Sequence, residues 1–482
     1  MIIARFLGGA SDYGLVCLAF AGVSIAVSLS LVGLPAGVTR YVSFYKGKGD
    51  KGRIKGTIIS ALKISFPLSL IISFIFFFSA DWISVRVFHE PRLAQVLMIF
   101  AVSIPFWVLR SNFNSAMVGF QVLQYQVYVN QFFENIFKLA AIVIFVALGF
   151  GVLGAAWGWS LAIILTPFLA FYFLEKKVFP VFNTKVKAIS VDKELFFFSF
   201  PLVFAGLAGL ITGWTDTLML GYFSTASDVG IYNAALPTAK LLSVGAGAFG
   251  VIFMPVVSEL YAMDRWEELK RTYSSVTKWI LSILLPLFLL MSLFSKEIIN
   301  VLFGSEFIAG ATALSILAFS YFISSLFALA APLLQSYGRT KIIMGGSFVG
   351  ASANFILNLF FIPIYGVKGA AFATGISFAL MSIIYLFFAY RVGKMQPFRR
   401  SFLKPVIASV IAVLVVYALT KYLIGVSLFA LIVMFIVFLM LYFLLLLVFK
   451  SFEEEDLMIM RAIDQRLGTK SDWLRKIIQR FL

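Results

Sequence analysis

The chain has 482 residues, of which 61% are hydrophobic and 13% are charged, and its mean hydropathy is +1.00. Soluble domains carry about 25% charged residues, so these charges are too few to cover a water-facing surface, and lipid must be the solvent for much of the chain. The net charge of +17 lies in short loops between apolar segments, which argues against a nucleic-acid-binding protein and is typical of membrane topology.

Thirteen apolar segments follow one another along the chain, separated by glycine, proline or short polar runs. A membrane helix needs roughly 20 apolar residues. The sequence therefore predicts an all-α polytopic membrane protein. Its thirteen helices are expected over residues 13–42, 58–79, 93–120, 126–149, 152–174, 197–221, 230–259, 277–294, 309–335, 343–362, 368–390, 405–420 and 427–449.

The basic residues between these helices are distributed unequally. Most of the 39 lysines and arginines fall in the connections of one side, as in 46–55, 176–193 and 391–404, and in the C-terminal tail. By the positive-inside rule this side is cytoplasmic. We therefore expect a multi-pass protein of the plasma membrane with a cytoplasmic C-terminus.

The chain repeats itself at an offset near 215 residues. Ala-Ser-Asp-Tyr-Gly at 10–14 reappears as Ala-Ser-Asp-Val-Gly at 226–230, and Gly-Val-Leu-Gly-Ala-Ala at 151–156 reappears as Gly-Val-Lys-Gly-Ala-Ala at 366–371. Short matches that agree on one offset rarely arise by chance, so they indicate a duplication. The repeat pairs the first five predicted helices with the five that start at residue 230.

The helix at 197–221 has no complete partner in the first half, because its counterpart would run from before residue 1 to about residue 5. We therefore predict two parallel six-helix lobes around a central cavity, with the first helix of lobe one largely missing. The expected domains are an N-terminal lobe (1–175), a cytoplasmic linker (176–196), a C-terminal lobe (197–391), two peripheral helices (405–449) and a cytoplasmic amphipathic tail (450–482).

Short patterns dispersed over about residues 1–450 carry a family resemblance. They are Ile-Ile-Ala-Arg-Phe-Leu-Gly at 2–8 with Tyr13 and Gly14, Gly-Leu-Pro at 33–35 with Thr-Arg-Tyr at 39–41, Asp-Thr-Leu-Met-Leu-Gly at 216–221, Gly-Ile-Tyr at 230–232, and the stretch from Asn354 to Gly366. Together they resemble the Wzx-type oligosaccharide flippases of the multidrug/oligosaccharidyl-lipid/polysaccharide exporter superfamily.

This resemblance implies a transporter for polysaccharide biosynthesis. It implies that a polyprenyl-diphosphate-linked oligosaccharide moves from the cytoplasmic to the outer leaflet by alternating access. The implied partners are this lipid-linked oligosaccharide, membrane lipids, and a polysaccharide polymerase with glycosyltransferases. A monomer is expected.

Four basic residues within predicted helices are not assigned to a connection: Arg40, Arg110, Lys138 and Lys240. An ionisable group at membrane depth costs several kcal/mol, which makes it a functional candidate. Arg110, Lys138 and Lys240 are expected to line one cavity and bind the diphosphate, and Arg40 to catch it near the inner interface. The alternatives are pairing of Lys138 with Glu134 at i,i+4 and snorkelling of Arg40.

Two acids lie more than one turn inside the ends of predicted helices, Glu134 and Asp216. Both are candidates for coupling transport to a cation or proton. Asp216 has two alternative roles, as a hydrogen-bonded packing residue or as a partner for Lys240.

The remaining composition bears on other functions. One cysteine and one histidine leave no disulfide framework or cysteine- or histidine-based metal site, so no metal or cofactor is expected. A membrane-embedded enzyme would need a cluster of carboxylates or histidines, so we expect no enzyme. A cation-coupled multidrug antiporter of the same fold would need acids, and only Glu134 and Asp216 oppose four bases. A lipid II flippase is the other alternative.

Overall fold

The computed structural model describes residues 2–423 and 428–452, and these residues form helices and connections without a strand. The all-α fold is therefore confirmed. Nine helices among the described residues are long and apolar enough to cross a membrane, which makes the chain a multi-pass membrane protein. The predicted amphipathic tail lies almost entirely outside the described residues.

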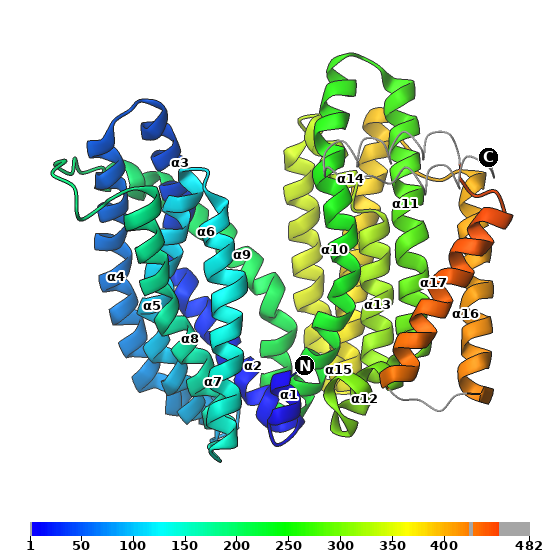
Figure 1. Ribbon diagram of the computed structural model, residues 1–482, viewed down its shortest axis with the longest axis horizontal. Coiled ribbons are helices and arrows are strands. Elements are labelled where there is room, and N and C mark those ends of the chain that lie inside the picture. The colour runs from blue at the N-terminus through cyan, green and yellow to red at the C-terminus, as the bar shows by residue number, and fades with distance from the viewer. Residues whose placement is uncertain (1, 424–427, 453–482) are drawn as a thin grey trace. The chain divides into compact units, whose positions relative to one another are not determined.

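The chain forms two compact units, Met1–Asn233 and Ala234–Leu482 (Figure 1). The first contains α1 (Ile2–Phe6), α2 (Ala10–Leu31), α3 (Leu34–Gly47), α4 (Lys51–Trp82), η1 (Ile83–Val87), α5 (Leu93–Gly119), α6 (Leu123–Val127), η2 (Tyr128–Phe133), α7 (Glu134–Ala147), α8 (Gly151–Phe173), η3 (Leu174–Val178), α9 (Asp192–Phe223) and the first turns of α10 (Ala226–Ala262).

The core of the first unit forms around α5. Leu93, Leu97, Phe100, Ile104 and Val108 recur every three or four residues along this helix and are completely or almost completely buried. Through this and its other faces, α5 packs on α2, α3, α4 and α8. Many outward side chains of the unit are apolar and exposed, such as Phe74 and Phe78 on α4, as expected for a surface that meets lipid rather than water.

The predicted helix 13–42 is wrong as a single element, because it consists of α2 and α3. Val32 and Gly33 both have positive φ, 49° and 68°, which ends α2. A Cβ on Gly33 would lie 2.3 Å from the carbonyl oxygen of Ser199 in α9, so a glycine is required at this close approach. Pro35 lies in the first turn of α3, where its missing N–H costs no hydrogen bond.

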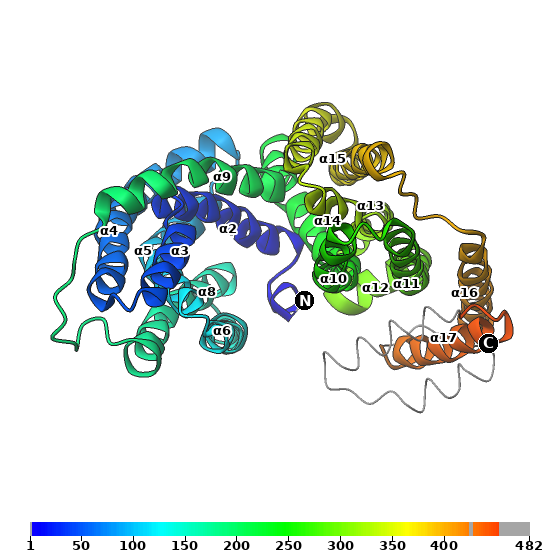
Figure 2. The ribbon, with the colours of Figure 1, turned by 90° about the horizontal axis from the view of Figure 1, so that it is seen from above.

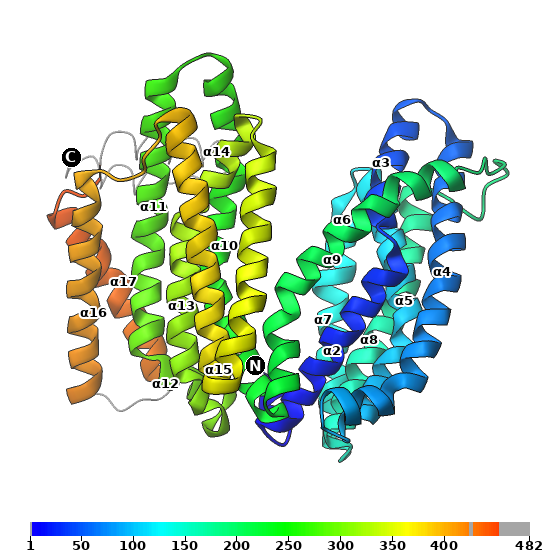
Figure 3. The same cartoon turned by 180° about the vertical axis from the view of Figure 1, so that it is seen from behind.

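The helix α9 packs on α2, α3 and α4 and therefore belongs by contact to the first unit (Figure 3). The sequence repeat instead places this segment in the predicted C-terminal lobe. The predicted lobe boundaries and central cavity stay predictions.

Two glycines that are equivalent in the sequence repeat meet in the first unit. A Cβ on Gly14 of α2 would lie 1.7 Å from the carbonyl oxygen of Ala226, and a Cβ on Gly230 of α10 would lie 1.9 Å from that of Ala10. The contacts are reciprocal, as expected when two copies of one segment cross. Only glycine allows the two backbones to approach this closely.

The second unit contains the rest of α10, α11 (Trp266–Leu293), α12 (Ser295–Phe303), η4 (Ser305–Gly310), α13 (Ala311–Leu326), α14 (Ala330–Ser336), α15 (Thr340–Gly393), η5 (Arg400–Phe402), α16 (Leu403–Leu423) and α17 (Leu428–Val448). Gly366 has φ 53° and ψ −128° and divides α15, at the turn predicted between 362 and 368. The predicted helix 309–335 corresponds to one candidate membrane span, Ser305–Ser336, which a turn at 327–329 divides into α13 and α14. α16 packs on both α11 and α17 (Figure 2).

A buried carboxylate fixes the start of the connection between α8 and α9. Glu175 is 5% exposed and accepts hydrogen bonds from the backbone N–H groups of Val181 at 2.7 Å, Phe182 at 3.1 Å and Asn183 at 2.7 Å. Further along, the backbone N–H of Ile189 donates to the carbonyl of Gly52 at 3.0 Å. The connection is thereby attached to the first unit.

Replacing Glu175 by alanine should release this connection. A buried N–H that loses its acceptor costs about 1–3 kcal/mol; here the buried N–H of Val181 and two partly buried ones lose it together. We expect faster cleavage by trypsin after Lys185 and Lys187, measured by mass spectrometry of the time course. Replacing the exposed neighbour Lys176 by alanine serves as the control; equal cleavage of both variants and the wild type would contradict this role for Glu175.

Candidate functional site

A buried ion pair joins α5 to α7 in the first unit. Arg110 on α5 is only 7% exposed, and its Nη1 donates to the carboxylate of Glu134. Glu134 is the first residue of α7 and directly follows the π-helix η2. Single π-helical turns occur often at functional sites because they change the direction of the side chains that follow.

Lys138 completes a cluster with this pair. Its Nζ donates to Asn135 Oδ1 at 2.9 Å and interacts electrostatically with both Arg110 and Glu134. The amide of Asn135 in turn donates to the carbonyl of Gln131 in η2 at 2.8 Å, which connects Lys138 to the π-helical turn. The ion pair that the carboxylate forms is with Arg110 across the helices, while its interaction with Lys138 is electrostatic only.

Aromatic rings surround the two cations. The guanidinium carbon of Arg110 lies 5.4 Å from the ring centroid of Trp107, and Lys138 Nζ lies 4.9 Å from that of Trp159. Phe20 lies against both indoles, with centroid separations of 5.3 and 4.5 Å, and contacts Trp214 at 5.7 Å. Cation–π contacts of this kind stabilise a desolvated cation by roughly 2 kcal/mol without neutralising it.

The cluster keeps an excess of positive charge and of hydrogen-bond donors. Two cations face one carboxylate. A guanidinium has five N–H donors and an ammonium three, yet within the described chain Arg110 donates only to Glu134 and Lys138 only to Asn135. The remaining donors suit an anion with several oxygens, because a guanidinium binds phosphate oxygens bidentately.

Two asparagines that the sequence reasoning missed lie one helical turn away. Asn114, four residues after Arg110, donates from Nδ2 to Asn130 Oδ1 at 2.8 Å, and Asn130 precedes Glu134 by four residues. Asn114 Oδ1 is buried and has no hydrogen-bond partner in the structure. The i,i+4 spacing of amides and charges on both helices was the signal available in the sequence.

The sequence also predicted a role for Arg40, which lies apart from this cluster. It is exposed on α3, and its guanidinium carbon lies 4.1 Å from the ring centroid of Phe198 on α9. Among the contacts of the described residues, none joins Arg40 to Arg110.

Lys240 lies on α10 in the second unit and is exposed. Its convergence with Arg110 and Lys138 on one cavity stays a prediction.

Asp216 lies on α9 and is 8% exposed. The hydroxyl of Tyr232 on α10 donates to its carboxylate, and beside it Thr217 and Asn233 hydrogen-bond to each other at 3.2 Å. These hydrogen bonds are the kind expected if Asp216 is a packing residue, which is one of its two alternative roles. A role for Asp216 in ion coupling stays a prediction.

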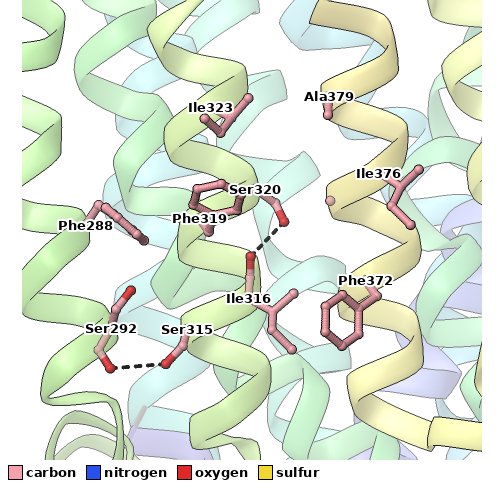
Figure 4. A pocket seen from close by; sticks show the side chains of 11 residues that line it. Phe288, Ser292, Ser315, Ile316, Phe319, Ser320, Ile323, Phe372, Ile376 and Ala379 are labelled. Carbon is pink, nitrogen blue, oxygen red and sulfur yellow. Dashed lines mark hydrogen bonds between the residues drawn. The ribbon is translucent and has the colours of Figure 1, made fainter.

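A cavity of about 450 Å³ lies within the second unit, between α11, α13 and α15 (Figure 4). Its walls are almost wholly apolar, with Phe288, Phe319 and Phe372 as the largest side chains. The hydroxyls of Ser315 and Ser320 donate to backbone carbonyls and are thus satisfied within the protein. The cavity has no charged wall and does not suit a diphosphate. No group of three potential metal ligands occurs among the described residues.

Two family models match the chain. The model described as "Polysaccharide biosynthesis protein" matches residues 1–261, and the model described as "MatE" matches residues 201–360.

Individual proteins show more distant similarity. The uncharacterized membrane protein MJ1068 of Methanocaldococcus jannaschii is 26% identical over 80% of this chain and 78% of its own length. The probable low-salt glycan biosynthesis flippase Agl15 of Haloferax volcanii is 27% identical over 40% of this chain and 41% of its own. The inward closed structure of the lipid II flippase MurJ has a TM-score of 0.65 at 17% identity, covering 93% of this chain and 98% of MurJ, which shows a shared fold.

Proposed function

This chain belongs to the polysaccharide biosynthesis protein family, and from that premise we propose that it transfers a polyprenyl-diphosphate-linked oligosaccharide between the leaflets by alternating access. The family predicted from the sequence is thus confirmed. At the level of general function, the chain is a membrane flippase of the wider exporter superfamily. The proposed direction is from the cytoplasmic to the outer leaflet of the plasma membrane, with the C-terminus cytoplasmic.

The observation that supports this cargo is the Arg110–Glu134–Lys138 cluster. Its two cations and one carboxylate leave a net positive charge, and its largely buried guanidinium has unused donors, in a membrane-spanning unit. A diphosphate would replace the hydration of these groups with charge-assisted hydrogen bonds. An apolar or cationic cargo would leave the donors unused.

The same proposal assigns roles to the other predicted residues. Arg40 captures the diphosphate near the inner interface, and Lys240 contributes from the second half of the chain. Asp216 and Glu134 are the proposed groups for coupling to a cation gradient. A polymerase and glycosyltransferases are the proposed partners of a monomeric transporter, which performs no chemical reaction itself.

The alternative of a multidrug antiporter is less well supported. An organic cation needs a carboxylate, but the carboxylate of Glu134 bonds to Arg110 and that of Asp216 accepts from Tyr232. The alternative of a lipid II flippase differs in the sugar, and a transport assay separates the two.

The test is leaflet transfer in liposomes that contain the purified protein and a fluorescent polyprenyl-diphosphate oligosaccharide. A membrane-impermeant quencher measures the fraction transferred. We expect transfer of this lipid and none of the same glycan attached to polyprenol without phosphate. Preferred transfer of lipid II would identify the alternative cargo. Gradient-driven movement of an organic cation, without transfer of either diphosphate lipid, would contradict the proposal.

A further inference from the structure

Glu134 has two cations within reach. Lys138 lies four residues later on the same helix, where an acid and a base usually meet. In the structure the carboxylate instead bonds to Arg110 on α5, and Lys138 bonds to Asn135. The buried guanidinium therefore already has an anionic partner, while Lys138 is left without a carboxylate of its own.

This arrangement matters because the surrounding membrane is rich in anions. The cytoplasmic leaflet contains phospholipids whose phosphodiester carries a single negative charge. An unpaired Arg110 would bind such headgroups, since guanidinium and phosphate are complementary in shape and charge. A ligand that approaches Arg110 in this structure must instead compete with a carboxylate that is already bound to it.

A diphosphate carries more than one negative charge and more acceptor oxygens than a phosphodiester. Coulomb attraction grows with the charge of the ligand. A diphosphate that contacts Arg110 and Lys138 together therefore gains more binding energy than a phosphodiester does. The displaced carboxylate stays within reach of Lys138 at i,i+4 on α7, and the three N–H donors of an ammonium can serve both anions. The side chain of Glu134 is 17% exposed against 9% for Arg110, so it is the more accessible member of the pair.

We infer that Glu134 determines the selectivity of the site. Its carboxylate competes with monoanionic phospholipid headgroups for Arg110, whereas a diphosphate displaces it from Arg110. This inference rests on the proposed function for its cargo, but it concerns the charge of the headgroup and not the sugar.

The experiment compares binding of two lipids to the purified wild type and to Glu134→Gln. The probes are farnesyl diphosphate and a short-chain phosphatidylglycerol, and the signal is the intrinsic tryptophan fluorescence, to which Trp107 and Trp159 beside the cations contribute. We expect the wild type to prefer the diphosphate. Glutamine keeps an oxygen acceptor but removes the competing charge, so phosphatidylglycerol should bind about tenfold more tightly to the variant.

Glu267→Gln is the matched control, because Glu267 is exposed at the start of α11. Glu134→Asp, which keeps the charge, should retain the selectivity and covers the case in which Glu134→Gln does not fold. Equal binding of phosphatidylglycerol to the wild type and Glu134→Gln would overturn the inference. So would loss of selectivity in a folded Glu134→Asp. If selectivity depends on Glu134 but no glycan lipid is transferred, the result supports the inference and contradicts the proposed cargo.

Discussion

Replacing Arg110 by glutamine is expected to reduce leaflet transfer of a polyprenyl-diphosphate oligosaccharide by about 30-fold or more. Removing one partner from a buried, hydrogen-bonded charge pair costs about 2–5 kcal/mol, and each 1.4 kcal/mol is a factor of ten. Glutamine removes the guanidinium that would bind the diphosphate. The measurement is the initial rate of transfer in liposomes with matched protein content.

Two further variants define what Arg110 contributes. Arg110→Lys keeps the charge but loses the planar fork of donors, so we expect an intermediate rate. Arg86→Gln removes an exposed charge from η1 and should transfer at the wild-type rate. A folded Arg110→Gln variant that transfers the lipid as fast as the wild type would remove the diphosphate site from this cluster.

Replacing Gly14 or Gly230 by alanine is expected to lower the melting temperature by about 5 °C or more. Overpacking a well-filled interior costs about 1–3 kcal/mol, which corresponds to a few degrees per kcal/mol in a unit of this size. Each added Cβ would lie less than 2 Å from a backbone carbonyl oxygen, so no side-chain rotation relieves the clash and α2 must move away from α10. Thermal unfolding in detergent measures the effect.

Gly247→Ala provides the control on α10 itself, because a Cβ at Gly247 meets no atom within 4 Å. Alanine at an open helical position should leave the stability unchanged or raise it slightly. The double variant Gly14→Ala/Gly230→Ala should cost less than the sum of the single ones, since both separate the same pair of helices. An unchanged melting temperature in both single variants would show that α2 and α10 do not pack this closely where they cross.

Much of the fold follows from local composition. Long apolar runs must form helices in lipid, because no water is present to satisfy the backbone, and most of the predicted boundaries lie within a few residues of the observed ones. The turn at Gly366 was recognisable from the proline and glycine around it. The break at Val32 and Gly33 was not, because Val32 reads as helix and a β-branched residue rarely adopts a positive φ.

The sequence by itself determined which side chains were candidates for the site. Arg110, Glu134 and Lys138 interrupt apolar runs, and a charge in such a run is too costly to persist without a role. The tertiary structure alone decided how they combine. Glu134 could bond to Lys138 on its own helix or to Arg110, 24 residues away, and the choice depends on how η2 and α5 orient the two side chains. Phe20, Trp107 and Trp159 come from three different helices, so only packing could bring the two indoles to the cations and Phe20 against both indoles.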